Sequence, residues 1–206
     1  MKKIVLSAAI FASLFVNAQD KGLQGAWFAT SQIGYQSTDN GGGNKSTNLL
    51  ILPVAGTFVT PSVAIGAGVG YLNITKDAAN VNVAKSNLYV IQPLARKYWN
   101  VAGGFYFFGQ MAAPIVFGSE TISSTDVSQF GLAASGGFDY FISKHFSVEF
   151  SYMLGNFSVT KVGTNATTTN FGLASVASVD PAYTSALGGS NGGLINPLSF
   201  GFKFVF

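Results

Sequence analysis

Two carboxylates and two cations are the groups of this chain that are best placed to act together. Charged residues make up only 9% of its 206 positions. Four of them nevertheless occupy alternate strand positions whose side chains we expect to face the interior of the fold: Arg96, Asp139, Glu149 and Lys203. Such a cluster can form a structural plug, line a gated ion path or supply a catalytic acid–base pair. An interior only just wide enough for its side chains favours the plug, and the acid–base pair is the weakest hypothesis because a substrate has no access to it.

The position of the two carboxylates follows from counting along one predicted hairpin. If residues 143–145 form a three-residue loop, Ile142 pairs with Phe146 and Asp139 lies directly opposite Glu149. Like charges directly opposite each other on a sheet are destabilising. We therefore expect cations beside this pair.

The same counting supplies the two cations. If Phe206 pairs with Phe146, Lys203 lies opposite Glu149. Arg96 lies at a similar height on another strand and shares the inward alternation. We predict that all four charges converge in one third of the interior, near the end at which the chain terminates.

Other catalytic or metal-binding sets are missing from the sequence. His145 is the only histidine and there is no cysteine, so neither a histidine-based hydrolase triad nor a zinc site has its parts. His145 itself is expected to be a solvated turn residue. The glycine-rich segment 66–70 lacks the spacing of a dinucleotide-binding loop, and we interpret its glycines as small inward-facing residues. The sequence thus predicts no enzyme activity, no cofactor and no metal.

Alternating side chains define the elements that position these groups. In residues 198–206, leucine and phenylalanine occupy every even position, and a β-strand sends such alternate side chains to one face. The alternation recurs and predicts about eight strands, at 25–36, 47–59, 63–75, 86–99, 104–118, around 129–140, from 146 to about 155, and 198–206. Polar connections at 37–46, 76–85, 119–125 and 162–193 alternate with tight turns. This rhythm predicts an all-β, antiparallel, up-and-down transmembrane β-barrel.

The exterior of the predicted barrel is apolar, as lipid requires. Aromatic residues gather toward both ends of the strands, and the outward face carries no charge near the middle of any strand. Lys97 faces outward but lies beside Trp99, where its ammonium can reach the interface. Four prolines fall within predicted strands, where a closed barrel has no free edge, and we expect them at bulges or beyond the membrane: Pro53, Pro93, Pro114 and Pro197.

The amino terminus is typical of an exported protein. A basic start, an apolar run over 4–16 and a small-residue cleavage site predict a signal peptide at 1–18 and a barrel domain at 19–206. No other apolar run approaches ~18 residues, which excludes a membrane-spanning helix. Without Lys2 and Lys3, the 11 basic residues fall to 9 against 8 acidic ones, a net charge of +1. This balance gives no reason to expect nucleic acid as a partner.

The alternating aromatics at the end of the chain resemble the signal that the barrel-assembly machinery reads, here Phe202, Phe204 and Phe206. Through this signal and its strand pattern, the chain resembles the small outer-membrane β-barrel proteins, such as the eight-stranded transmembrane domain of outer-membrane protein A. The junction at 17–19 is similar to those of Bacteroidota exports. The resemblance implies a place in the cell outer membrane, with outer-membrane lipid and the barrel-assembly machinery as partners.

A non-catalytic function fits these observations best. An integral outer-membrane protein of this kind contributes to envelope integrity or presents loops to partners outside the cell. The 162–193 loop is the longest predicted connection, and long loops are usually functional or disordered, so we expect it to contact any extracellular ligand. The alternative is a narrow porin-like channel for ions or small solutes.

Overall fold

The structure is a computed structural model that describes residues 23–164, 166–173 and 198–206. Its strands are β1 (Trp27–Asp39), β2 (Lys45–Thr60), β3 (Val63–Ala78), β4 (Val81–Ala102), β5 (Phe105–Ala112), β6 (Ile115–Glu120), β7 (Thr125–Ser143), β8 (Phe146–Val162), β9 (Ala166–Leu173) and β10 (Leu198–Val205). The described part of the chain has no helix that is long and apolar enough to cross a membrane. The predicted signal peptide at 1–18 lies outside the described residues.

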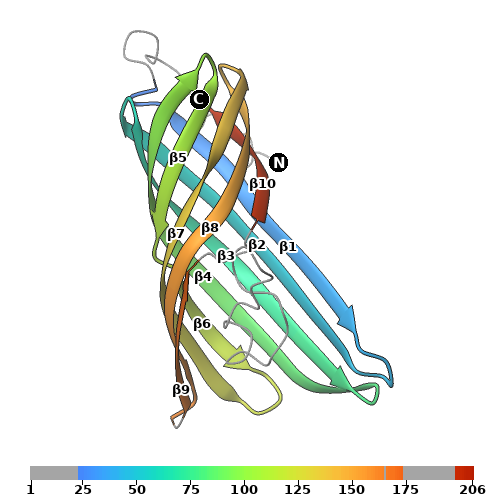
Figure 1. Cartoon of the computed structure of the whole chain (residues 1–206). Helices are drawn as coiled ribbons and strands as arrows, with labels where there is room; N and C mark the ends of the chain where they lie inside the picture. The colour runs from blue at the N-terminus through green and yellow to red at the C-terminus, as the bar shows by residue number, and fades with distance from the viewer. Residues whose placement is uncertain (1–22, 165, 174–197) are drawn as a thin grey trace, which may run out of the picture.

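The strands form one antiparallel sheet that closes into a ring with eight strand positions (Figure 1). β5 and β6 follow one another between β4 and β7 and so occupy one position. β10 and β9 share another, because β10 pairs with the first part of β8 and β9 with the second. The predicted all-β antiparallel fold is therefore confirmed.

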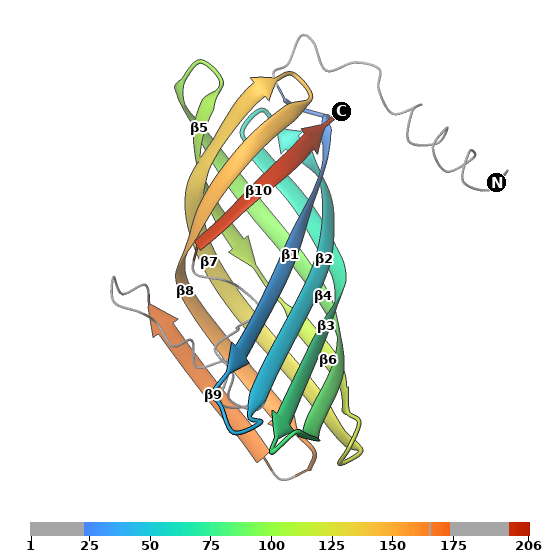
Figure 2. The same ribbon diagram turned by 90° about the vertical axis from the view of Figure 1, so that its right-hand side faces the viewer.

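Closure of the ring is uneven along its length (Figure 2). The ladder between β1 and β10 covers only Phe28–Thr30. Beside it, the backbones of Trp27 and Phe206 exchange two hydrogen bonds of 2.7 and 2.9 Å. We call this end of the ring the near end. At the opposite, far end, β3 turns into β4 through Ala79 and Asn80.

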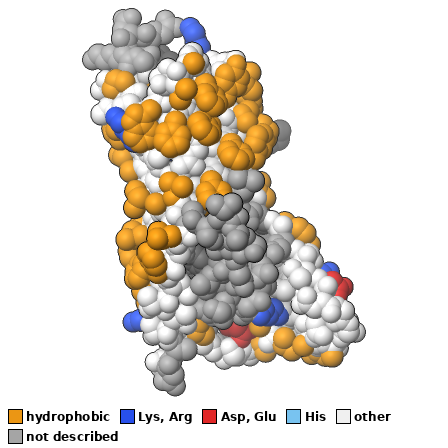
Figure 3. Space-filling view, in the orientation of Figure 1, with side chains coloured by type: hydrophobic (Ala, Val, Ile, Leu, Met, Phe, Trp, Pro, Cys, Tyr) orange, Lys and Arg blue, Asp and Glu red, His pale blue; other side chains and the backbone are white. Residues whose placement is uncertain are grey.

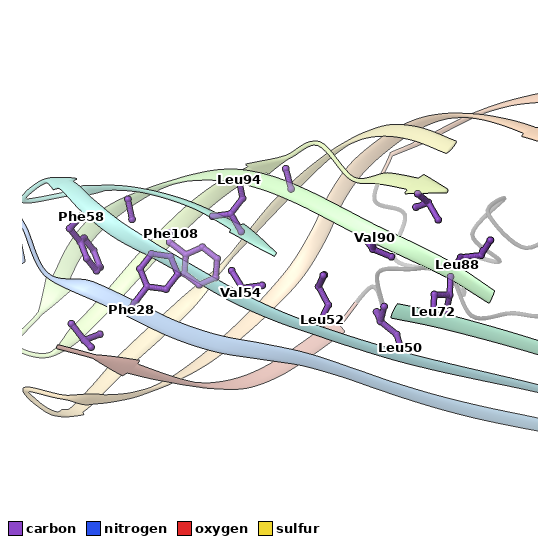
Figure 4. Close-up of a cluster of buried hydrophobic side chains, with 14 of the residues drawn as sticks. Phe28, Leu50, Leu52, Val54, Phe58, Leu72, Leu88, Val90, Leu94 and Phe108 are labelled. Carbon is purple, nitrogen blue, oxygen red and sulfur yellow. The ribbon is translucent and has the colours of Figure 1, made fainter. Parts of the chain in front are cut away.

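Side chains alternate between the interior and the exterior, as predicted. In β4 the even-numbered residues from Leu88 to Tyr98 are buried and the odd-numbered ones, such as Tyr89 and Trp99, are exposed. The interior holds a cluster of large apolar groups (Figure 4): Phe28, Phe58, Phe108, Leu50, Leu52, Leu72, Leu88, Val90 and Leu94. The exterior is apolar too, as Figure 3 shows for one face. Both faces of the sheet are therefore largely apolar.

The glycines of β3 make room for this core, which confirms their interpretation as small inward residues. A Cβ atom at Gly66 would lie 3.2 Å from Cζ of Phe28, and one at Gly70 would lie 2.9 Å from Cδ1 of Leu52. Since interiors are close-packed, the large residues of β1 and β2 fit only because the facing residues of β3 are glycines, which have no side chain.

The predicted polar loops are much shorter than expected, because the strands continue through their polar residues. The loop predicted at 76–85 shrinks to Ala79 and Asn80. Their φ angles of 50° and 62° are the left-handed values that a type I′ hairpin turn requires. Likewise, 37–46 shortens to 40–44 and 119–125 to 121–124.

The loop predicted at 162–193 is wrong in its first part. Residues 166–173 form β9, which pairs with Gly155–Val162 of β8. Its sequence is rich in threonine, a β-branched residue that favours strands. The rest of the predicted loop, 174–193, lies outside the described residues.

Pro53 and Pro93 lie in continuous register, so the first of the two expected locations, a bulge, is wrong for both. Pro53 pairs with Ser31 of β1, and only the ladder to β3 skips it. Pro93 pairs with Ala67 of β3, and its carbonyl accepts a 2.9 Å hydrogen bond from the amide of Ala113. Each proline therefore interrupts the ladder on one side only, where its missing N–H would point.

Pro114 divides the predicted strand 104–118 into β5 and β6. Its side chain is fully buried in the interior, and its carbonyl accepts a 2.8 Å hydrogen bond from the amide of Gly131 on β7. Register continues unchanged across the break. Pro197 lies outside the described residues.

Candidate functional site

The four charged residues singled out in the sequence meet inside the ring. This ion cluster, defined as Arg96, Asp139, Glu149 and Lys203, draws its members from β4, β7, β8 and β10. Each side chain lies on the inward face because its neighbours along the strand face outward. Three ion pairs join the four residues.

Arg96 is held on several sides. Its Nη1 lies 2.6 Å from Oε2 of Glu149 and 3.1 Å from the hydroxyl of Tyr98. Its Nε and Nη2 both donate to Oε1 of Gln110, at 2.9 and 2.7 Å. The guanidinium carbon also lies 4.1 Å from the ring centroid of Phe108, where a cation is attracted to the ring face. The planar fork of arginine suits such multiple contacts, which a lysine ammonium at this position would not reproduce.

Lys203 ties the last strand to the same cluster. Its ammonium pairs with Oδ2 of Asp139 and donates to the hydroxyl of Tyr98 at 3.0 Å. Oε2 of Glu149 lies 3.8 Å away. Because the hydroxyl of Tyr98 accepts from both Lys203 and Arg96, it connects the two halves of the cluster.

The cluster is sealed from water. The side chains of Lys203 and Asp139 have no exposed surface, and those of Arg96 and Glu149 are 6% and 12% exposed. Burying an unpaired charge is costly, and here two positive and two negative charges cancel. Four aromatic residues border the cluster: Phe58, Tyr106, Phe108 and Phe141.

The predicted register of the carboxylates is confirmed, since Asp139 lies directly opposite Glu149. The turn beside them differs in one respect. Phe146 pairs with Ser143 instead of Ile142, and a bulge at Ile142 restores the predicted register further along. Counting along a short hairpin was therefore sufficient for this pair.

The predicted position of Lys203 is wrong by two residues. Phe146 pairs with Phe204, so Lys203 lies opposite Ser147 and not opposite Glu149. The lysine chain is long enough to reach the cluster from this position, and its closest carboxylate is that of Asp139 on β7.

Tyr98 and Gln110 are hydrogen-bond partners of the ion cluster that the sequence did not lead us to predict. Both are uncharged, so composition draws no attention to them, although both share the inward alternation. Gln110 lies opposite Arg96 only because of a bulge between Asn100 and Ala102, and plain counting from the pair of Ala102 and Phe105 would place Met111 there instead.

The three aromatic residues of the predicted assembly signal lie at the ring's closing strand. Phe202 and Phe204 point outward and are 53% and 57% exposed. Phe206 is half-buried, and its backbone pairs with Trp27 of β1 instead of with the predicted Phe146.

A tight turn at the far end carries a second set of charge-assisted contacts. The carboxylate of Glu120 accepts hydrogen bonds from the backbone amides of Lys85 at 2.8 Å, Ile122 at 3.0 Å and Ser123. Burial acts to raise the pKa of Glu120, but these hydrogen bonds outweigh it and lower the pKa to about 2. Glu120 thus fastens the β6–β7 turn to β4.

The arrangement inside the ring joins four strands through paired charges. Both carboxylates of the ion cluster are held by cations, and little of any member is exposed. Among the described residues, no three metal-binding side chains come together. His145 is exposed in its turn, with Nδ1 3.0 Å from the carbonyl oxygen of Val205.

Comparison with known proteins adds no family to this picture. No protein-family model matches the sequence, and no curated protein matches it at a significant level. The proposals below therefore rest on the chain's own residues.

Proposed function

We propose that this protein is an integral outer-membrane β-barrel without enzymatic activity, which contributes to envelope integrity or presents its far end to partners outside the cell. The observation that carries this proposal is the outward face of the ring. That face is apolar between two rows of aromatic side chains on neighbouring strands. Soluble monomers rarely expose apolar surface of such extent, whereas a barrel in lipid requires it.

The spacing of the aromatic rows fits the thickness of a membrane. Three positions of the ring carry exposed aromatic residues ten positions apart: Tyr89 and Trp99, Phe107 and Phe117, and Phe130 and Tyr140. Ten residues of strand at ~3.3 Å each span about 33 Å. A tilt of ~40° reduces this length to a height of about 25 Å, which is the height of the apolar band of outer-membrane barrels.

Outward-facing charged side chains are nearly absent from the apolar band between the two aromatic rows of the described strands. Between the two rows, Lys97 is the only charged residue that faces outward among the described strands. Its ammonium donates to Oγ of Ser62 at 2.6 Å, in the turn between β2 and β3 at the near end. The charge is thereby directed past Trp99 toward water, as expected for a lysine at a membrane interface.

The interior favours a closed barrel over the porin-like channel. The ion cluster occupies the near half of the interior. Next to it lie the rings of Phe28, Phe58 and Phe108, each no more than 1% exposed. A conducting ion would have to displace both layers.

We place the near end in the periplasm and the far end outside the cell. β4 begins eight positions before Tyr89 but ends three positions after Trp99, so the hairpins project much further beyond the far aromatic row. Outer-membrane barrels have short turns on the periplasmic side and longer connections outside. Two far-end turns are also joined, because the amide of Asn80 donates to the carbonyl of Gly43 at 3.0 Å. The described part of the partner-facing surface is then built from hairpins.

Localisation and conductance test the proposal. The full chain expressed in a Gram-negative host should fractionate with outer membranes, and folded protein should run faster on SDS gels unboiled than boiled. In planar bilayers it should give no regular conductance steps. Recovery in the soluble fraction without detergent would contradict a membrane barrel. Regular conductance steps would contradict the closed interior and favour the channel.

A further inference from the structure

The closing strand β10 has a much shorter ladder with β1 than with β8. It pairs with β8 over Leu198–Phe204 but with β1 only opposite Phe28–Thr30, beyond which Phe206 and Trp27 exchange two backbone hydrogen bonds. A strand can slip along its neighbours in steps of two residues without changing which face its side chains occupy. The register of β10 therefore needs a specific determinant.

The outward face of β10 does not provide this determinant. The outward residues of β10 whose side chains the structure describes are phenylalanines, at 200, 202 and 204. Phe146 on β8 contacts two of them about equally, with ring centroids 5.7 Å from Phe202 and 5.2 Å from Phe204. A two-residue slip replaces one phenylalanine by the next, so the burial of apolar area hardly changes.

The inward residues of β10, by contrast, differ in type from one position to the next. Gly201 lies opposite Glu149, and a Cβ atom there would already lie 3.4 Å from Cγ of that glutamate. Lys203 reaches Asp139 on β7 and Tyr98 on β4. A two-residue slip moves the ammonium by about 6.6 Å along the strand, which separates it from Asp139 and leaves a buried carboxylate without its cation.

We propose that Lys203 sets the register in which the last strand closes the ring. Slippage by one residue is prevented by the alternation of β10, because it would turn the phenylalanines inward. Slippage by two residues is prevented by the ion cluster, because only one register brings Lys203 to Asp139. The cluster therefore acts during closure as well as in the finished barrel.

Cysteine pairs can report the register, because the chain contains no cysteine of its own. Phe202 lies opposite Val148, so cysteines at 148 and 202 should form a disulfide in the observed register. Cysteines at 148 and 204 should form one only after a two-residue slip, since Cα atoms more than ~7 Å apart cannot be bridged. In otherwise unchanged, folded protein, the first pair should cross-link and the second should not.

Lys203→Met should allow both cross-links to form in comparable yield, whereas Lys144→Met in the neighbouring turn should leave only the first. If Lys203→Met keeps the 148–202 cross-link alone, the inference is wrong. A swap variant, Gly201→Lys with Lys203→Gly, decides the question even if Lys203→Met does not fold. It should move the partner of position 148 from 202 to 200. Retention of the 148–202 cross-link in the swap variant, or its failure to fold, would overturn the proposal.

Discussion

Replacing Arg96 by methionine gives the most direct test of the ion cluster. The substitution keeps a long, flexible side chain but removes the guanidinium. Glu149 then loses its partner at 2.6 Å and keeps only the ammonium of Lys203 at 3.8 Å. Oε1 of Gln110 loses both donors that it has from Arg96. The change therefore leaves one charged and one uncharged acceptor poorly paired inside the ring.

The expected loss is large because the site is dry. Breaking a buried ion pair by removing one partner costs about 3–5 kcal/mol, whereas an exposed pair contributes about 0–1 kcal/mol. Glu149 is only 12% exposed at its side chain, so the higher range applies. Adding Glu149→Gln should recover part of the loss, since it removes the charge that was left unpaired.

Urea unfolding in detergent micelles or lipid vesicles measures these changes, with the fluorescence of Trp27 and Trp99 as the signal. Lys97→Met is the matched control: it removes a cation one residue away on the same strand, but from the exposed face. We expect the control to cost about 1 kcal/mol or less. A loss below about 1 kcal/mol for Arg96→Met, or no recovery with Glu149→Gln, would refute the conclusion that the ion cluster is shielded from water and stabilises the fold. Increased conductance with unchanged stability would favour an ion path.

Three further outcomes follow from the contacts described. Lys203→Met should lower the urea midpoint, and Asp139→Asn should restore part of it, because Lys203 pairs with that carboxylate; failure of the second change to help would mean that the two are not coupled. Deleting Phe206 removes its two backbone hydrogen bonds to Trp27, so exported protein should accumulate unfolded in the periplasm, as cell fractionation and gel mobility would reveal. The pKa of Glu120 is lowered to about 2 in the folded protein. Its contribution should be complete above the ordinary value of about 4.3 and be lost as the pH falls toward 2. Protection of the amides in the 121–124 turn, measured as exchange relative to the intrinsic rate at each pH, should then fall across this range in the parent chain, but not in Glu120→Gln.

Much of the fold was predictable because strand alternation is a local property. Whether Tyr89 faces outward and Val90 inward follows from a period of two, and both faces of the sheet obey it. Strand ends were less predictable. Polar residues near 76–85 suggested a loop, but hairpins that project beyond an apolar band can be polar on both faces and remain strands.

The ion cluster was predictable where pairing is local and uncertain where it is not. Asp139 and Glu149 are joined by a short hairpin, so their register follows from counting, and even the bulge at Ile142 does not disturb it. β10 follows β8 only after residues 163–197, which include β9, and its repeating phenylalanines fit several registers equally well. Counting from that pattern placed Lys203 two residues away from its observed position.

The sequence by itself determined the alternation of faces, the antiparallel order of strands and the presence of four inward charges. These depend only on neighbouring residues and short turns. Tertiary structure decided which charges pair, that Tyr98 and Gln110 complete the cluster, and where β10 stops along β8. Those features depend on side chains that meet across the interior from distant strands, and their packing and electrostatics distinguish registers that are equivalent in the local pattern.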